Sequence, residues 1–280
     1  MNLFNIYKKS LQIVLSNPLI TTYLVLFFII SSIFLGRIFA SETKIIAMIL
    51  CIGLIALNLC FTSGWLYVIK NTITAKETSK STSLSVFFEG VGKNIIPLGI
   101  GSLLYSVCLL IILFLTSKFA SNVFGSLDFI LKDFSNIIQD KNALIQYLLS
   151  LNDAQKQILA MHEICITFSG IIFIFSMLFY FPAIIFNEKT HLLSKPIIAI
   201  KDALVFLFQN FINSLLLFIC IYIIHAFLQI LGVLFDSNFI LSTIILIFNI
   251  YFISIAIMLI FNYYGYKNNC NNGCNSIRED

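Results

Sequence analysis

Few polar residues lie inside the apolar stretches of this chain, and those few are the first candidates for chemistry. Beside scattered Ser and Thr, we single out three amides and one imidazole: Asn58, His225, Gln229 and Asn249. His225 and Gln229 are four positions apart, which places them on one face of a helix, where they could line a polar cavity together with Asn249. The alternative is that these side chains form hydrogen bonds between helices, each worth about 0.6–2 kcal/mol.

Two cysteines near the C-terminal end have the spacing of half a zinc site. Cys270 and Cys274 stand in the segment Asn-Cys-Asn-Asn-Gly-Cys, whereas a structural zinc ion takes four ligands, usually from two paired motifs. A metal would therefore need a second copy of the chain or a partner. We favour two solvated thiols and expect neither a metal nor a cofactor.

The known sequence signatures of catalysis are missing. The chain has no glycine-rich phosphate loop, no His-Glu-x-x-His and no Gly-x-Ser-x-Gly. His162-Glu163 and His191 fall on opposite sides of the membrane in the topology derived below, so they cannot form one acid–base pair. We expect no catalytic residue and no enzymatic activity.

The composition indicates which kind of secondary-structure element carries these residues. Apolar residues make up 59% of the 280 positions and charged residues 11%, against roughly 25% charged in a soluble domain. This excludes a soluble enzyme, a disordered chain and a nucleic-acid-binding domain. Six uncharged stretches reach the ~20 residues that a membrane-crossing helix needs: 18–36, 45–69, 95–116, 164–186, 207–231 and 239–262.

Basic residues are divided unevenly between the two sides of this membrane domain. Eleven of the 17 Lys and Arg residues fall on one side, in the N-terminal segment, the 70–94 and 187–206 loops and the C-terminal segment. Cytoplasmic loops carry the excess of Lys and Arg. We therefore expect a multi-pass protein of the inner (plasma) membrane with both termini in the cytoplasm.

The spans are grouped in a way that predicts an internal repeat. An amphipathic stretch precedes each odd-numbered span, at 3–17, 83–94 and 196–210, and each ends at an asparagine. In the first stretch one face is apolar and the lysines lie opposite, which is typical of a helix in the membrane interface; the apolar face holds Leu3, Phe4, Tyr7, Leu11 and Val14. We predict an all-α polytopic fold built as three repeats of interfacial helix plus two spans. The alternative is that such helices and Asn caps are simply common near membranes.

Several of these segments resemble a known group of membrane proteins. The resemblance rests on Ser63-Gly64-Trp65-Leu66-Tyr67, on Phe87-Phe88-Glu89-Gly90, on Phe181-Pro182 through Glu188 and on Ala199 to Asn210. They are similar to bacterial six-helix integral membrane families of unknown function, distantly like the membrane domain of some glycerophosphoryl diester phosphodiesterases. The chain departs from relatives at Asp202-Ala203, where a serine is frequent, and about 18 residues follow the sixth span, so we expect no phosphodiesterase domain. The resemblance implies an architecture and no active-site residue.

One membrane domain, 1–266, is expected, with a cytoplasmic tail at 267–280. The segment 117–163 is too long for a simple connector, and we expect a helical insertion on the outer side, either a lid over the bundle or a surface helix without a ligand. Asn152 and Gln155 predict a capping box for a helix that continues into the fourth span.

Two function classes follow from these observations. The first is a non-enzymatic integral membrane protein that organises lipid or a partner at the cytoplasmic membrane. The alternative is a transporter or permease subunit for a lipid or an apolar small molecule. The expected partners are membrane lipids and either another protein or a second copy of the chain; a net charge of +4, scattered along the chain, argues against nucleic acid.

Overall fold

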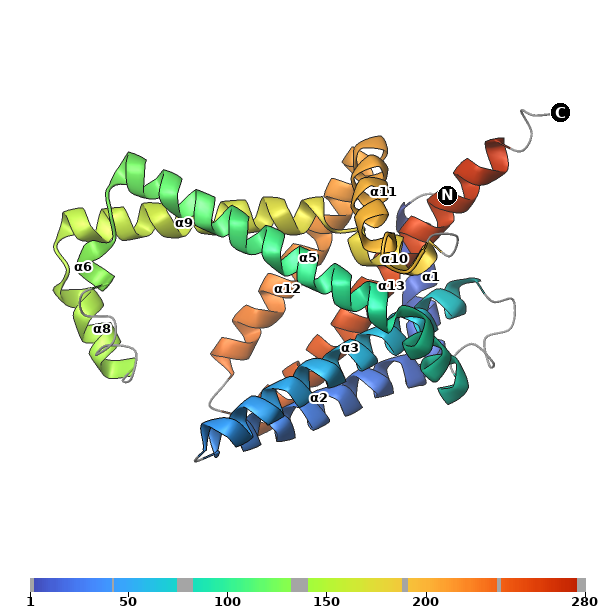
Figure 1. The fold of residues 1–280 in the computed structure, drawn as a ribbon, viewed down its shortest axis with the longest axis horizontal. Coiled ribbons are helices and arrows are strands. Elements are labelled where there is room, and N and C mark those ends of the chain that lie inside the picture. Colours follow the sequence, from blue (N-terminus) through green and yellow to red (C-terminus); the bar gives the residue numbers. More distant parts are fainter. Residues whose placement is uncertain are drawn as a thin grey trace. The chain divides into compact units, whose positions relative to one another are not determined.

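The structure, a computed structural model, describes residues 3–41, 43–74, 83–131, 141–187, 191–235 and 238–275. Every regular element in these ranges is an α-helix, and Figure 1 shows them in chain order by colour. The helices are α1 (Leu3–Ser16), α2 (Pro18–Phe39), α3 (Lys44–Thr74), α5 (Leu84–Phe124), α6 (Asp128–Leu131), α8 (Lys141–Ser150), α9 (Asp153–Ser176), α10 (Tyr180–Phe186), α11 (Lys195–Gln209), α12 (Phe211–Leu234) and α13 (Phe239–Asn275).

Six helical segments are long and apolar enough to cross a membrane: α2, α3, α5, α9 with α10, α12 and α13. Their outward faces are apolar as well. On α3, Ile49, Ile52 and Ile55 are 59–61% exposed, a face that hydrocarbon tails cover without the cost that water would impose. The prediction of an all-α polytopic membrane protein with six transmembrane helices is confirmed.

Helix α5 differs from the predicted pattern because it has no interruption. We expected a stretch ending at Asn94 and then a span at 95–116, but α5 is one helix of 41 residues with Pro97 inside it. Membrane helices tolerate such a proline. Asn17 does separate α1 from α2, and Asn210 separates α11 from α12, as predicted. Since only two of the three stretches are separate helices, the threefold repeat stays a prediction.

The run that we predicted as one span at 164–186 contains a break. Helix α9 ends at Ser176 and α10 begins at Tyr180. Pro182 stands in the first turn of α10, where its missing N–H costs little, whereas in a continuous helix its ring would collide with the carbonyl of Leu178. The chain divides into two compact units, with one boundary at this break and the other inside α5 after Ser102: unit 1 is Met1–Ser102 with Met177–Asp280, and unit 2 is Leu103–Ser176.

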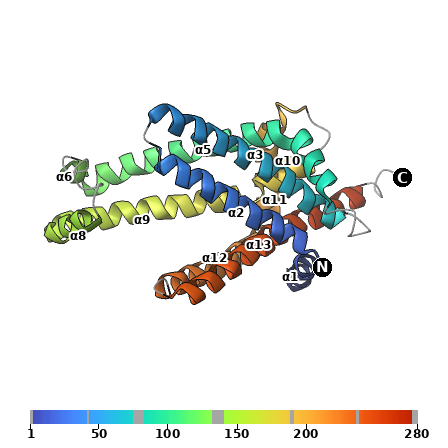
Figure 2. The ribbon, with the colours of Figure 1, turned by 90° about the horizontal axis from the view of Figure 1, so that it is seen from below.

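Unit 1 concentrates its buried side chains at one end of its helices. The ring of Phe206 on α11 lies 4.7 Å from the ring of Phe179 and 4.7 Å from that of Tyr264 on α13. Trp65 on α3 donates a hydrogen bond from Nε1 to the carbonyl of Ile20 on α2 (2.9 Å). The α2–α3 and α12–α13 pairs extend away from this core (Figure 2). We call it the basic end, because these lysines lie on the elements that meet there: Lys8, Lys9, Lys70, Lys93, Lys195 and Lys201.

Helix α1 packs against α13 at the basic end. Its buried residues Ile6, Ser10 and Val14 recur every four positions and therefore form one stripe. The amide of Asn262 on α13 donates a hydrogen bond to Ser10 Oγ (3.1 Å), and both side chains are buried. This contact fixes α1 to the last span.

The rest of α1 is mostly exposed and has an apolar sector and a polar sector. The apolar surface of α1 therefore extends beyond the stripe that packs against α13. Of the predicted apolar face, Val14 is buried whereas Phe4 and Tyr7 are 68% and 39% exposed. The buried stripe and the exposed apolar sector lie side by side on α1. The buried stripe packs against the protein, and the exposed apolar sector faces the surroundings of the protein. The exposed residues are Phe4, Tyr7 and Leu15 in the apolar sector and Asn5, Lys8, Lys9, Gln12 and Ser16 in the polar sector.

Unit 2 contains the predicted insertion, whose described part is helical except at residues 125–127 and 151–152; residues 132–140 lie outside the described part. Gly125, at φ +111°, ends α5 in a conformation that favours glycine, and its carbonyl lies 2.9 Å from Nε2 of the buried His162. The capping box is confirmed. The N–H of Asn152 donates to Gln155 Oε1 (3.1 Å), and the N–H of Gln155 donates to Asn152 Oδ1 (2.8 Å), at the start of α9.

Candidate functional site

A cavity of about 470 Å³ at the basic end of unit 1 is lined by three lysines. Its polar lining comes from three helices: Tyr67 and Lys70 on α3, Lys93 and Asn94 on α5, and Lys195 on α11. Gly92, Ile185 and Leu192 also line it.

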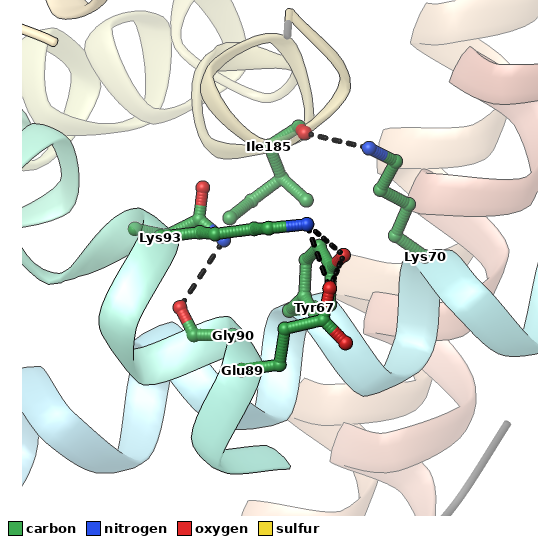
Figure 3. Close-up of polar contacts among 7 residues, drawn as sticks. Tyr67, Lys70, Glu89, Gly90, Lys93 and Ile185 are labelled. Atoms are coloured by element: carbon green, nitrogen blue, oxygen red, sulfur yellow. Dashed lines mark hydrogen bonds and ion pairs between the residues drawn. The ribbon is translucent and has the colours of Figure 1, made fainter. Parts of the chain in front are cut away.

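Lys70 is an unusual lining residue, because its side chain is only 7% exposed and lysines are seldom fully buried. Its Nζ donates to the carbonyl of Ile185 (3.3 Å; Figure 3). That carbonyl belongs to the last turn of α10, where carbonyls lack helical partners and favour a cation. The same Nζ lies 5.7 Å from the ring centroids of Tyr67 and Phe186, close enough for a cation–π attraction.

Lys93 belongs to a three-residue polar network on the α3–α5 side (Figure 3). Its Nζ donates to Glu89 Oε1 (2.6 Å) and to the hydroxyl of Tyr67 (3.2 Å), and that hydroxyl donates to the same Glu89 oxygen (3.0 Å). The Lys93 and Glu89 side chains are 59% and 47% exposed, so the pair adds little to stability. Its effect is to hold Lys93 at the edge of the cavity.

Lys195 is held from the opposite side and is 6% exposed. The amide nitrogen of Asn94 donates to the carbonyl of Gly90 (3.2 Å), which turns its oxygen toward α11, where Lys195 Nζ donates to it (3.4 Å). Asn94, predicted as a boundary residue, thus positions a lysine of the cavity.

Two glycines set the distance between α3 and α5. A Cβ on Gly90 would lie 2.5 Å from Cβ of Tyr67, and a Cβ on Gly64 would lie 2.7 Å from the ring of Phe87. Small residues allow membrane helices this close approach. Because Tyr67 lies against Gly90, the two helices place Lys70 and Lys93 around one cavity.

The charge balance of the cavity is positive. Among the described side chains that line it, three are ammonium groups and none is a carboxylate, and the neighbouring Glu89 offsets only part of this charge. Lysines bind phosphate as compact point charges with three donors each. The arrangement is therefore suited to an anion, and phosphate is the anion that membranes supply in quantity.

An apolar cavity of about 330 Å³ lies in the same unit. On α3 it is lined by Thr62 and Leu66, and Lys70 of the polar cavity follows one turn later. On α10 it is lined by Pro182, and Ile185 of the polar cavity again follows one turn later. The linings of the two cavities are thus offset by about 6 Å along α3 and about 4.5 Å along α10. Trp65, Phe27, Phe61, Phe181 and Phe261 are among the other residues that line the apolar cavity.

The four intramembrane polar residues lie apart from this polar cavity. Asn58, exposed on α3, accepts a hydrogen bond from Thr62 Oγ1 (3.2 Å), and Asn249 on α13 donates to the carbonyl of Ile245 (3.1 Å). Both described bonds stay within one helix.

The other two residues of that set are on α12. His225 is exposed, with its ring 6.5 Å from the ring of Phe252 on α13 and nearly parallel to it. Gln229 is exposed one turn further on. Asn249 lines a second apolar cavity, of about 590 Å³, between α2 and α13. A polar cluster of Asn58, His225, Gln229 and Asn249 stays a prediction.

The sequence analysis used the cavity lysines only to decide which loops face the cytoplasm. Two local signals were present. Glu89 and Lys93 have the spacing of an ion pair on a helix, and Tyr67 stands three positions before Lys70, a spacing at which two side chains are neighbours on a helix surface. The pairing of Lys70 with Ile185 spans 115 positions, and that of Asn94 with Lys195 spans 101. Neither long-range pairing is visible in a single sequence.

Cys270 and Cys274 belong to the end of α13, and their side chains lie outside the described part of the chain. Among the residues described, no group of three or more His, Cys, Asp or Glu side chains could hold a metal ion. Comparisons with protein-family models, with curated proteins and with solved structures gave no match. The resemblance to six-helix membrane families stays an expectation.

Proposed function

We propose that this chain is a non-enzymatic protein of the cytoplasmic membrane that keeps an ordered shell of lipid around its basic end. Three features support the proposal. The elements at that end carry the lysines, both described termini of unit 1 lie on helices that meet there, and the spans bear no formal charge over their central stretches. Under the positive-inside rule this end faces the cytoplasm.

The observation that carries the proposal is the outward face of α1. Phe4 and Leu15, 68% and 63% exposed, stand beside an exposed sector that contains Lys8 and Lys9. An apolar sector next to a basic one fits a helix that lies at the headgroup boundary. Ser10 and Asn262 fix this helix to the bundle, so the lipid that it contacts is held against the spans.

A pair of matched variants tests this role. Replacing Phe4 and Leu15 with Glu puts two charges into the apolar sector, and replacing Asn5 and Gln12 with Glu puts the same charge into the polar sector. We expect the first variant to retain less copurified phospholipid per protein and the second to resemble the wild type. Equal lipid retention in both variants would remove the basis of the proposal.

The two apolar cavities favour a second candidate, a carrier for a lipid or an apolar small molecule. Thr62→Trp would put an indole ring into the cavity of about 330 Å³ that Thr62 lines and narrow it, and Thr22→Trp, at an exposed position on α2, is its control. A carrier predicts flux of fluorescent phospholipid across vesicles containing the wild type and the control, and loss of flux with Thr62→Trp. Absence of flux in wild-type vesicles would reject this candidate.

A further inference from the structure

Helix α12 exposes a polar face in the middle of its span. Tyr222, His225 and Gln229 are all exposed, and their spacing of three and four positions places them within about 60° of one another around the helix. His225 lies about 21 Å from the start of a helix that is about 36 Å long. The imidazole and the amide therefore belong to the part of α12 that the hydrocarbon surrounds.

The hydrogen-bonding groups of this α12 polar face are not used within the described part of the chain. Among the described residues neither His225 nor Gln229 takes part in a hydrogen bond, and His225 only stacks near the ring of Phe252. Ser32 and Asn249, by contrast, bond to a carbonyl one turn back in their own helices. Lipid tails offer neither a donor nor an acceptor. The imidazole and the amide of α12 therefore require a polar neighbour, which in a membrane is usually protein.

A second copy of the chain matches this face in chemistry and in depth. The uneven distribution of Lys and Arg favours one orientation for every copy, so a neighbouring copy brings its own His225 and Gln229 to the same depth. A carboxamide both donates and accepts hydrogen bonds, as does a neutral imidazole. The face is therefore complementary to itself across a two-fold axis. Tyr222 and Val233, 49% and 79% exposed, lie on the same side of the helix and add apolar contact.

We propose that the chain forms a homodimer through the α12 polar face, in which the amide of Gln229 bonds to the same amide of the second copy. The two His225 rings meet one turn away, about 6 Å along the helices. The proposal goes beyond the lipid-organising role and does not rest on it, because α1 contributes no residue to this face. Hydrogen bonds between membrane helices are individually modest, so the dimer should dissociate when the protein is diluted in lipid.

Energy transfer between two dyes measures this dimer in the full chain. Lys201→Cys in a cysteine-free background carries either a donor or an acceptor dye, and the mixture is diluted in phosphatidylcholine vesicles over a range of mole fractions. We expect saturable transfer, and Gln229→Leu should raise the half-saturating mole fraction about tenfold, or ~1.4 kcal/mol. Because leucine is apolar and position 229 is exposed, this variant should fold.

Two further variants show that the amide group of Gln229 is the cause. Gln229→Asn keeps a donor and an acceptor, so it should restore most of the energy transfer. Asn249→Leu is the matched control, since it removes an amide whose described bond lies within α13, and it should leave the half-saturating mole fraction unchanged.

Disulfide formation locates the contact on α12. Val233 and Leu234 are adjacent, both exposed and at nearly the same depth, but around the helix they lie about 40° and about 140° from Gln229. In the cysteine-free background, oxidation should join two copies of the Val233→Cys variant but not two copies of the Leu234→Cys variant.

Three results would overturn the proposal: a monomer at every mole fraction, equal disulfide yields at the two positions, or equal effects of Gln229→Leu and Asn249→Leu. A monomer would leave the α12 polar face to a different protein or to another part of the same chain. None of these results bears on lipid retention by the α1 variants, so the dimer and the proposed function can fail separately.

Discussion

Lys70 illustrates how one side chain connects segments far apart in the chain. It leaves α3 one turn beyond Leu66, reaches the last turn of α10, and its charge lies near the rings of Tyr67 and Phe186. A methionine would fill much of the same space without a charge. The free energy of unfolding therefore distinguishes a lysine kept for packing from one kept for a ligand.

We expect Lys70→Met to change the free energy of unfolding in neutral lipid by less than about 1 kcal/mol. The variant loses the described hydrogen bond to the Ile185 carbonyl and the attraction to the Tyr67 and Phe186 rings, and it also removes the desolvation of a buried charge. Stabilisation of the wild type by added phosphatidylglycerol should be lost in the variant. The melting temperature in vesicles with and without phosphatidylglycerol measures both effects, and a large loss of stability without anionic lipid would indicate a structural role instead.

The buried bond between Ser10 and Asn262 gives a second prediction at this scale. Ser10→Ala leaves the Asn262 amide without its described acceptor inside the protein, which should cost about 1 kcal/mol in reversible unfolding. Ser32→Ala is the control, because Ser32 is exposed and its described hydrogen bond is to the carbonyl of Phe28 in its own helix. A double-mutant cycle with Asn262→Leu should give a coupling energy of similar size, and additive effects would contradict the prediction.

Among the elements, α5 depends on glycine for its position against α3. Gly90→Ala would put Cβ 2.5 Å from Cβ of Tyr67, and neither atom is the end of a flexible chain, so the helices must separate. We expect a loss of about 1–3 kcal/mol and weaker contact of Lys93 with Tyr67. Gly92→Ala, with open space at its Cβ, should instead stabilise α5 by up to ~1 kcal/mol. Thermal unfolding of both variants provides the comparison.

Sequence patterns predicted the elements well where local rules decide them. Six apolar runs gave six spans, and the pair Asn152 and Gln155 gave the start of α9. They failed where a proline had two outcomes: Pro97 is accommodated inside α5, whereas Pro182 stands in the first turn of α10, after a break. Which outcome occurs depends on neighbouring helices that can satisfy or replace the lost backbone bond. The arrangement of neighbouring helices belongs to the tertiary structure and cannot be read from local sequence.

The candidate site was less predictable than the elements, for a related reason. Lys70, Lys93 and Lys195 were assigned one side of the membrane from their loops, but nothing local showed that they share a cavity. Their common position depends on contacts between helices more than 100 positions apart. Conversely, the intramembrane His225 and Gln229, the strongest candidates by residue type, are exposed on α12.

At the scale of the whole molecule, sidedness is open to a direct test. Thr43 stands just before α3, and Lys201 stands at the basic end; α3 alone is about 46 Å long. In a cysteine-free background we expect a membrane-impermeant thiol reagent to label Lys201→Cys only from the cytoplasmic side and Thr43→Cys only from the opposite side. Labelling of both from one side would contradict the six-span topology.

The contact between α1 and α13 also has a consequence for synthesis. Ser10 is made before its partner Asn262, which follows 252 positions later. At ribosomal rates of about 5–20 residues per second, the stripe of Ile6, Ser10 and Val14 waits roughly 13–50 s for the helix that covers it. During that interval five spans enter the bilayer, and the membrane surface is the nearest apolar environment for α1. The basic end can complete its packing only after α13 has been inserted and α1 has packed against it.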